Sequence, residues 1–217
     1  HQCGAQQRRL DEALAQVAAQ ISLLSSLGVR LVIVHGGGPQ VSELSRRLGS
    51  EPKIIAGRRI TDDIALDAVV MAVAGDLNVS VLSALRAHHV RAVGLSGVDA
   101  ELVSAHKRPP VDIVDDSGQT QRVDFGHVGD IERVDPRVLE TLLQADYVPV
   151  VSCLASDEQG NVYNINADTL AESLAVALRA QKLIFMTSSP GVLRDRTDPS
   201  TLVTFADPDD LTSLLSS

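Results

Sequence analysis

The chain is poor in aromatic residues and in cysteine, and both shortages limit what it can be. Among 217 residues there is no Trp, three are Phe and two are Tyr, so aliphatic side chains have to form the hydrophobic core. The two cysteines, Cys3 and Cys153, lie far apart, and no CxxC or Cys/His cluster accompanies them. A disulfide scaffold and a zinc site are therefore not indicated, and we expect a reducing, cytoplasmic environment.

Positive charge is scarce as well. The chain has 19 Lys and Arg against 28 Asp and Glu, a net charge of −9, which argues against a nucleic-acid or anionic-membrane partner. No signal-like segment opens it, and no apolar run reaches the roughly 18 residues of a membrane helix. With 44% hydrophobic residues, it can still bury a core as one large domain or two lobes.

One stretch, residues 31–39, stands out for its chemistry. Four β-favouring apolar residues, 31–34, predict a strand buried on both faces, and Gly36, Gly37 and Gly38 let a ligand approach the backbone closely. Pro39 suits the first turn of a helix. A turn from a strand into a helix presents unpaired N–H groups and the positive end of the helix dipole, so this stretch predicts an anion site. A glycine turn with a purely structural role is the alternative.

The rest of the chain alternates helical and strand patterns. Apolar periodicity and capping residues predict helices at 5–27, 39–48, 64–74, 77–88, 136–145, 168–180 and 208–215. Strands are predicted at 31–34, 92–95, 148–152 and 183–187, with a ribbon or loop at 53–61, a hairpin within 103–123 and a turn at 126–131. This alternation indicates an α/β fold with a mostly parallel central sheet and a ligand site at the carboxyl ends of its strands.

The residues at these strand ends are mainly Gly, Ser, Thr, Asn and Asp, with Arg58 and Arg59 nearby. No Ser/His/Asp or Cys/His arrangement is apparent. Amides, an arginine and a carboxylate suit the binding of phosphates and carboxylates, so phosphoryl transfer is the favoured reaction class.

Five ordered motifs resemble those of the acetylglutamate kinases, which belong to the amino-acid kinase superfamily: His35-Gly36-Gly37-Gly38-Pro39, Gly57-Arg58-Arg59-Ile60-Thr61-Asp62, Gly94-Leu95-Ser96-Gly97, Val128-Gly129 and Asn164-Ile165-Asn166-Ala167-Asp168. The resemblance implies a three-layer α/β/α sandwich with an acyl-amino-acid-binding lobe at 1–155 and a partial nucleotide-binding lobe at 156–217. It also implies transfer of the ATP γ-phosphate to the side-chain carboxylate of N-acetyl-L-glutamate, a step of arginine biosynthesis.

The resemblance assigns roles residue by residue. It places Gly37 and Gly38 at the transferred phosphoryl group and the substrate, Arg59 at the substrate α-carboxylate and Asn164 at the substrate. Asp168 matches the carboxylate that positions the catalytic lysines, although capping of a helix alone would also explain it. Arg58 stands where the family usually has an apolar residue, and either arginine could instead be a solvated surface charge.

The nucleotide loop matches less closely. The resemblance assigns it the residues Thr187, Ser188, Pro190, Gly191, Val192 and Leu193, with Ser188 where an aspartate is usual, and it implies ATP with nucleotide-carried Mg²⁺. None of Lys53, Lys107 and Lys182 stands in the setting of the two catalytic lysines. We therefore expect the chain to lack the family's first strand and C-terminal part, either as a fragment of a longer kinase or as a degenerate member. Turnover is then expected to be impaired, and the open sheet edge to favour a homodimer or larger homo-oligomer.

Two other functions fit the same motifs. One is the kinase-like domain of N-acetylglutamate synthase, and the other is a non-catalytic amino-acid sensor of the same fold. The missing lysines favour the sensor, whereas Asn164 and Asp168 speak against the synthase domain. A sensor should bind its ligand without consuming ATP, so a phosphate-transfer assay separates it from a kinase.

Overall fold

The computed structural model describes residues 2–55, 57–114, 120–187, 191–195, 198–207 and 210. Its contacts divide the chain into two compact units, His1–Gln181 and Lys182–Ser217. Each unit is described by itself. The lobe boundary at residue 155 stays a prediction.

A parallel three-stranded sheet lies at the centre of the first unit, with the order β1-β9-β4. It consists of β1 (Ile33–His35), β9 (Val148–Ser152) and β4 (Ala92–Ser96). Every residue of β9 is buried, but β1 is only half-buried. The prediction of a strand buried on both faces was therefore wrong for β1, because β9 is the only described strand that pairs with it.

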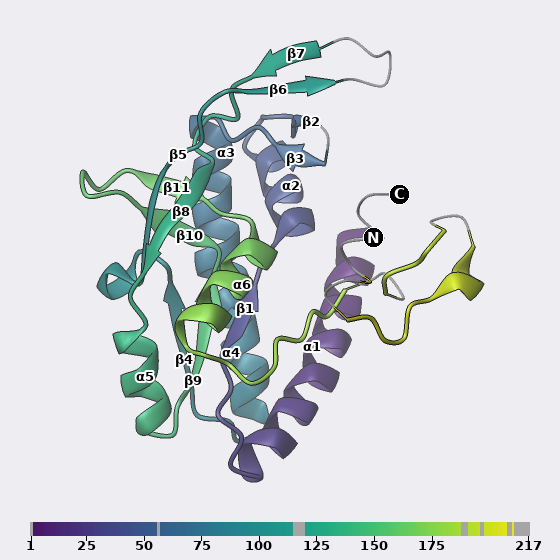
Figure 1. Ribbon diagram of the computed structural model, residues 1–217, viewed down its shortest axis with the longest axis vertical. Helices are drawn as coiled ribbons and strands as arrows, with labels where there is room; N and C mark the ends of the chain where they lie inside the picture. The colour runs from purple at the N-terminus through teal and green to yellow at the C-terminus, as the bar shows by residue number, and fades with distance from the viewer. Residues whose placement is uncertain are drawn as a thin grey trace. The chain divides into compact units, whose positions relative to one another are not determined.

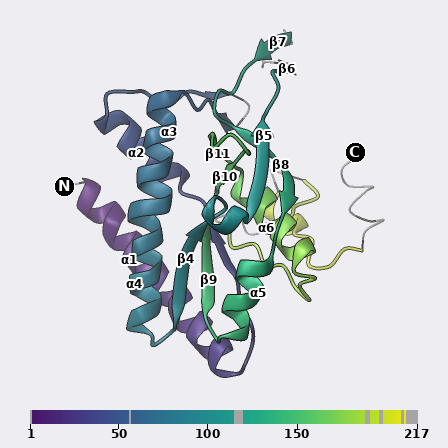
Figure 2. The same ribbon diagram turned by 90° about the vertical axis from the view of Figure 1, so that its left-hand side faces the viewer.

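Helices cover both faces of this sheet, which confirms the expected three layers (Figures 1 and 2). On one side lie α1 (Gln2–Ser26), α2 (Gly38–Arg47), α3 (Asp63–Val69), η1 (Val70–Leu77) and α4 (Asn78–Ala87). On the other side lie α5 (Arg137–Gln144) and α6 (Ala167–Ala177). The aliphatic core lies between these layers, with Val150, Val151 and Leu170 fully buried.

The two predicted helices at 64–74 and 77–88 form one continuous rod from α3 through η1 to α4, so the predicted break was wrong (Figure 2). The middle section, η1, is π-helical. Gly75 lowers helix propensity there by about 1 kcal/mol, but Ala72, Val73 and Leu77 are buried around it. Burial of these three side chains outweighs the propensity cost and keeps the rod intact.

By length and composition, this rod, Asp63–Ala87, could cross a membrane. In the structure, 44% of its most apolar window is buried, and its α4 part packs on β4 and β9. One such helix is weak evidence for a membrane protein, because the core helix of a soluble protein meets the same criterion.

A second sheet has the order β11-β10-β5-β8. Its strands are β11 (Val162–Asn164), β10 (Leu154–Ser156), β5 (Val103–Lys107) and β8 (Gly129–Val134). The segment predicted as a turn at 126–131 is a turn only at its start, because β8 begins at Gly129 and pairs with β5. Gly129 lets the start of β8 approach β11 closely, since a Cβ there would lie 2.7 Å from Cβ of Tyr163.

Two small ribbons project from this body. β2 (Ile54–Ile55) pairs with β3 (Arg58–Arg59), and β6 (Val111–Val114) pairs with β7 (Thr120–Val123). Both agree with the predicted ribbon and hairpin, while the predicted turn residues 115–118 lie outside the described residues. The two ribbons meet in a small apolar cluster that includes Ile55, Val111 and Phe125.

Most predicted helix ends are confirmed. Gly28, with φ of +79°, follows α1, and the Asp62 carboxylate accepts a hydrogen bond from the Ala65 N–H at 2.9 Å as the N-cap of α3. One cap differs: Asn166, not Asp168, caps α6, accepting from the Thr169 N–H at 2.9 Å. Asp168 lies inside the first turn.

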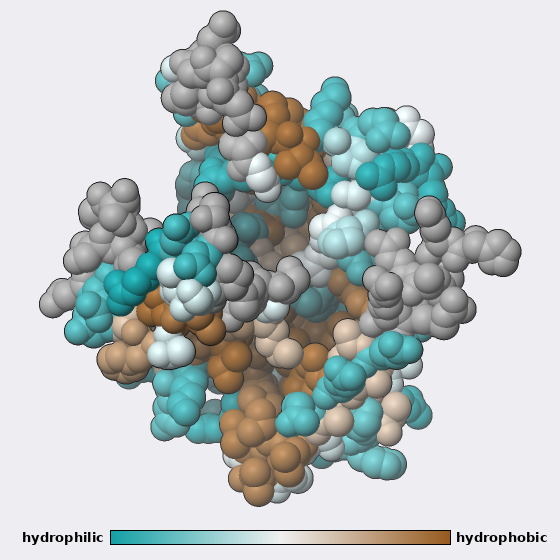
Figure 3. All heavy atoms as spheres, turned by 90° about the vertical axis from the view of Figure 1, so that its right-hand side faces the viewer, coloured by the Kyte–Doolittle hydropathy of each residue, from teal (hydrophilic) through white to brown (hydrophobic). Residues whose placement is uncertain are grey.

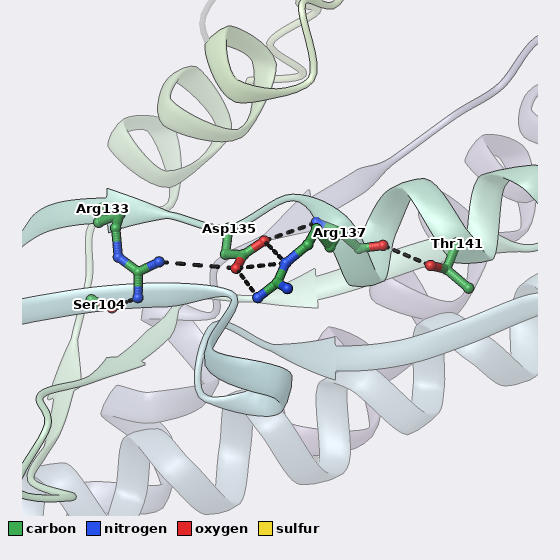
Figure 4. A network of polar contacts seen from close by, with 5 residues as sticks. All are labelled: Ser104, Arg133, Asp135, Arg137 and Thr141. Carbon is green, nitrogen blue, oxygen red and sulfur yellow. Dashed lines mark hydrogen bonds and ion pairs between the residues drawn. The ribbon is translucent and has the colours of Figure 1, made fainter.

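An ion-pair network fixes the start of α5 (Figure 4). The Arg137 guanidinium donates to both oxygens of Asp135, and Arg133 lies on the other side of that carboxylate. Together they lower the pKa of Asp135 to about 2. Figure 1 shows α5 at the lower left of the first unit, away from α2.

Apolar side chains remain exposed at the end of α1, on the face that Figure 3 shows. They belong to Leu23, Leu24, Leu27 and Val29. Scattered exposed apolar residues are normal at protein surfaces.

The second unit contains little regular structure among its described residues. Residues 182–187 carry no strand, so the strand predicted at 183–187 was wrong. No described strand runs alongside to pair with them. Leu193 and Leu202 form an isolated antiparallel bridge next to the short helix η3 (Pro199–Thr201). The predicted helix at 208–215 lies outside the described residues, except for Asp210.

Candidate functional site

The glycine stretch forms the corner that its sequence predicts. β1 ends at His35, and α2 begins at Gly38 with Gly37 as its N-cap and Pro39 in its first turn. The first N–H groups of a helix have no intrahelical acceptors and lie at the positive end of its dipole. A Cβ at Gly38 would meet no atom within 4 Å, whereas a Cβ at Gly37 would lie 3.0 Å from Val73 Cγ2.

Arg59 reaches this corner from β3. Its Nη2 donates to the Gly38 carbonyl oxygen at 3.1 Å and to Ser42 Oγ at 2.6 Å. Its Nη1 is buried and has no hydrogen-bond partner in the described part of the chain. Burial, and to a lesser degree the positive charge of Arg46, lowers the pKa of Arg59. The guanidinium stays protonated. It therefore presents an unpaired cationic donor beside Gly36, Gly37 and Gly38, the turn between β1 and α2 that we call the glycine corner.

Asn164 joins the same region through Thr61, two residues after Arg59. The Asn164 amide nitrogen, Nδ2, donates to Thr61 Oγ1 at 3.2 Å. Thr61 is completely buried, and its backbone oxygen accepts from the His127 N–H at 2.7 Å. The Gly126 backbone, with φ of +70°, passes so close that a Cβ there would lie 2.2 Å from that oxygen. The β2–β3 ribbon, which carries Arg59, and the end of β11 are thus fixed to each other.

Asp168 lies near the glycine corner because its neighbour, Ala167, packs close to Gly36. A Cβ at Gly36 would lie 3.3 Å from Cβ of Ala167, the first residue of α6. The N-termini of α2 and α6 therefore both lie at the glycine corner. The Asp168 side chain is exposed in the first turn of α6.

His35, at the end of β1, is held against the corner. Its Nδ1 lies 3.1 Å from the Gly36 carbonyl oxygen, so we assign the Nδ1–H tautomer, in which the ring donates to that oxygen. Its Nε2 is buried without a partner among the described residues. Burial lowers the pKa of His35, which keeps the imidazole neutral near pH 7.

The structure brings together the predicted residues Gly37, Gly38, Arg59 and Asn164, with Asp168 beside them. Arg58 is exposed on the same strand as Arg59. Of the predicted nucleotide loop, Thr187, Gly191, Val192 and Leu193 lie among the described residues of the second unit, while Ser188 and Pro190 lie outside them. Val192 accepts a backbone hydrogen bond from the Val203 N–H at 2.8 Å.

Sequence reasoning missed three residues of this site. Ser42 accepts a hydrogen bond from Arg59, and Thr61 accepts one from the Asn164 side chain. His127 links Thr61 to Asn164, because its N–H donates to the Thr61 oxygen and its carbonyl oxygen accepts from the Asn164 N–H at 2.8 Å. The His127 ring pairs with the Asp63 carboxylate through Nε2, at 2.7 Å. A sequence signal existed only for Ser42, which lies one helical turn after Gly38 and so shares its face of α2.

Comparison with known proteins points to one family. Residues 5–216 match the Amino acid kinase family. The chain is 51% identical to the acetylglutamate kinase of Myxococcus xanthus over 197 residues, which are 90% of this chain and 64% of that protein. It is 41% identical to the acetylglutamate kinase of Methanothermobacter thermautotrophicus over 210 residues, 96% of this chain and 72% of that protein.

Solved structures agree. A protein from Streptococcus mutans UA159 matches with a TM-score of 0.70 and 32% identity, over 81% of this chain and 67% of that one. An N-acetylglutamate synthase from Neisseria gonorrhoeae, solved with coenzyme A and N-acetyl-glutamate, matches with a TM-score of 0.68 and 28% identity, over 88% of this chain and 40% of that one. The chain thus spans about two thirds of the curated relatives' length.

Proposed function

The chain belongs to the amino acid kinase family, in its acetylglutamate kinase branch, and we propose that it transfers the γ-phosphate of ATP to the side-chain carboxylate of N-acetyl-L-glutamate. The product is N-acetylglutamyl 5-phosphate, an acyl phosphate used in arginine biosynthesis. The proposal rests on the sequence relatives and on the chemistry of the glycine corner.

The observation that carries the proposal is the unpaired Nη1 of Arg59. A buried donor of a charged group without an acceptor costs about 1–3 kcal/mol or more, and a ligand carboxylate would remove that cost. Asn164, fixed to the same region through Thr61, offers its amide oxygen to a donor such as the acylated nitrogen of the substrate. We assign Arg59 to the α-carboxylate and Asn164 to the neighbouring amide.

The transfer itself needs no protein nucleophile or base. The side-chain carboxylate of the substrate is ionised at neutral pH, so its oxygen can attack the γ-phosphorus directly. A new P–O bond forms to the carboxylate, the bond to the β,γ-bridging oxygen breaks, and ADP departs with that electron pair. Catalysis then depends on positioning and on charge stabilisation.

We assign charge stabilisation to the glycine corner. The N–H groups of Gly37 and Gly38 and the positive ends of α2 and α6 suit the developing charge on the phosphoryl oxygens. Asp168 takes the role of a positioning carboxylate for cationic groups of the kinase. Several kcal/mol of further stabilisation would come from the lysines that the family resemblance implies, so we expect this chain alone to turn over slowly.

For the phosphoryl donor we propose ATP, bound by the described loop residues Thr187, Gly191, Val192 and Leu193 together with Ser188 and Pro190. Magnesium would arrive on the nucleotide and neutralise phosphate charge when bound. We further propose a cytoplasmic homodimer or larger homo-oligomer. The free, buried thiol of Cys153, whose pKa burial raises to about 11, is compatible with a reducing compartment.

Calorimetric titration with N-acetyl-L-glutamate tests the substrate assignment. We expect Arg59→Ala to weaken binding about 100-fold, since a buried charge-assisted contact contributes roughly 2–5 kcal/mol. Arg58→Ala is the matched control, because Arg58 is the exposed neighbour on the same strand. It should bind within about twofold of the wild-type chain.

Two outcomes would contradict the proposal. Absence of binding by the folded wild-type chain would reject the substrate, and equal losses from both arginine variants would reject the role of Arg59. If binding is confirmed, incubation with MgATP and hydroxylamine separates a kinase from a sensor, because only an acyl phosphate yields the hydroxamate.

A further inference from the structure

A single nitrogen of Arg59 is held by two acceptors on α2. Nη2 donates to the Gly38 carbonyl oxygen at 3.1 Å and to Ser42 Oγ at 2.6 Å. Residues 38 and 42 lie one turn apart on one face of α2. The guanidinium thus lies along the first turn of the helix, at the glycine corner.

These two contacts use both hydrogens of Nη2. Because the guanidinium is planar and rigid, fixing Nη2 at two points also fixes the direction of the Nη1 hydrogens. Nη1 is buried and has no partner among the described residues, so its hydrogens are the ones left for a ligand. Holding the donor in place before binding reduces the entropy lost when a ligand arrives.

We propose that Ser42 is a positioning residue that presets Arg59 for a ligand carboxylate. The inference rests on the proposed function, in which that group is the α-carboxylate of the acylated amino acid. Without the Ser42 hydroxyl, Nη2 keeps only the longer contact to Gly38, and the guanidinium gains freedom to turn toward solvent.

Ser45 provides the matched control. It lies on the same helix, and its buried Oγ has no hydrogen-bond partner in the part of the chain that the structure describes. Ser45→Ala therefore removes the same atom from the same element without touching Arg59. Ser42→Thr keeps a hydroxyl at position 42 and serves as the rescue variant.

The test is calorimetry on the 217-residue chain with two ligands, N-acetyl-L-glutamate and its analogue with an α-carboxamide in place of the α-carboxylate. We expect Ser42→Ala to weaken N-acetyl-L-glutamate binding about tenfold, Ser42→Thr to stay within about threefold of wild type, and Ser45→Ala to bind as wild type does. Affinity for the carboxamide should be the same in wild type and Ser42→Ala, because Arg59 then has no carboxylate to hold.

Wild-type affinity in Ser42→Ala, or equal weakening for both ligands, would overturn the role of Ser42. Failure of the wild-type chain to bind N-acetyl-L-glutamate would instead overturn the proposed function, and the inference with it. Thermal melting of each variant shows that the chain is folded. In a turnover assay the loss should appear in the KM for N-acetyl-L-glutamate, while kcat and the KM for ATP stay unchanged.

Discussion

At the scale of single residues, hydroxyl groups orient the two side chains that we propose face a ligand. Ser42 holds Arg59, and Thr61 holds Asn164. Each contact joins two separate parts of the chain. Together they fix the distance between Arg59, which we assign to the substrate carboxylate, and Asn164, which we assign to the substrate amide. Positions set by rigid elements are more accurate than positions on a free loop.

Replacement of Thr61 tests this role for Asn164. Thr61→Val keeps the buried shape but removes the oxygen that accepts from Asn164 Nδ2, so the amide can turn away. We expect N-acetyl-L-glutamate to bind about three- to tenfold more weakly, the effect of one ordinary hydrogen bond. Thr61→Ser should restore the affinity in the same titration. If Val and Ser variants bind equally, the hydroxyl has no positioning role.

His35 makes stability depend on pH at the centre of the site. Its pKa in the folded chain lies below the ordinary value of 6.5 because burial disfavours the imidazolium. The unfolded chain therefore binds more protons as the pH falls below 6.5, and stability is lost until the pH reaches the lower, folded pKa. His35 contributes no such loss above 6.5.

We expect His35→Asn to reduce this loss. The Asn amide nitrogen can still donate to the Gly36 oxygen, as Nδ1 does, but it does not titrate. In urea unfolding at pH 7 and at pH 5, the drop in unfolding free energy should be smaller in the variant than in the wild-type chain. An unchanged drop would mean that groups other than His35 cause it.

At the scale of elements, glycine has opposite effects at different positions. Gly75 lies in the middle of η1, where a Cβ would meet no atom within 4 Å. Gly97 follows β4, where a Cβ would lie 2.2 Å from the Leu154 carbonyl oxygen. The first position has room for alanine, and the second does not.

Alanine at each glycine should therefore shift stability in opposite directions. Gly75→Ala is expected to raise the free energy of unfolding by about 0.5–1 kcal/mol, because alanine favours the helix. Its Tm should rise by about 1–4 °C. Gly97→Ala should lower stability by about 2 kcal/mol or more, since backbone has to move. A lower Tm for Gly75→Ala would show that η1 needs glycine for its π-helical shape.

Much of the fold at this scale was predictable, because local patterns determined it. The apolar run and glycines of residues 31–39 predicted β1, the glycine turn and α2, whereas Arg59 and Asn164 were assigned to the site by the family resemblance. The edge position of β1 was not predictable, since strand order depends on pairing with β9, far away in the chain. The same holds for Ser42 and Thr61, whose partners lie 17 and 103 residues away.

At the scale of the whole molecule, the outer side of the rod Asp63–Ala87 leaves four large apolar side chains exposed: Ile64, Val70, Met71 and Val79. The inner side of the same rod is buried against α2 and the sheet. Apolar patches of this kind often mark protein–protein interfaces. This rod is where we expect the proposed homo-oligomer to form its contact.

A charge placed on that side should separate the subunits. We expect Met71→Asp to shift sedimentation from a dimer or larger assembly toward the 23.0 kDa monomer, because an unpaired carboxylate would be buried in the contact. Val176→Asp is the control, since Val176 is 73% exposed on α6, on the other side of the sheet. If Val176→Asp rather than Met71→Asp dissociates the assembly, the contact lies on the α6 side. If the wild-type chain sediments as a monomer at micromolar concentration, the rod does not form a stable contact in this chain.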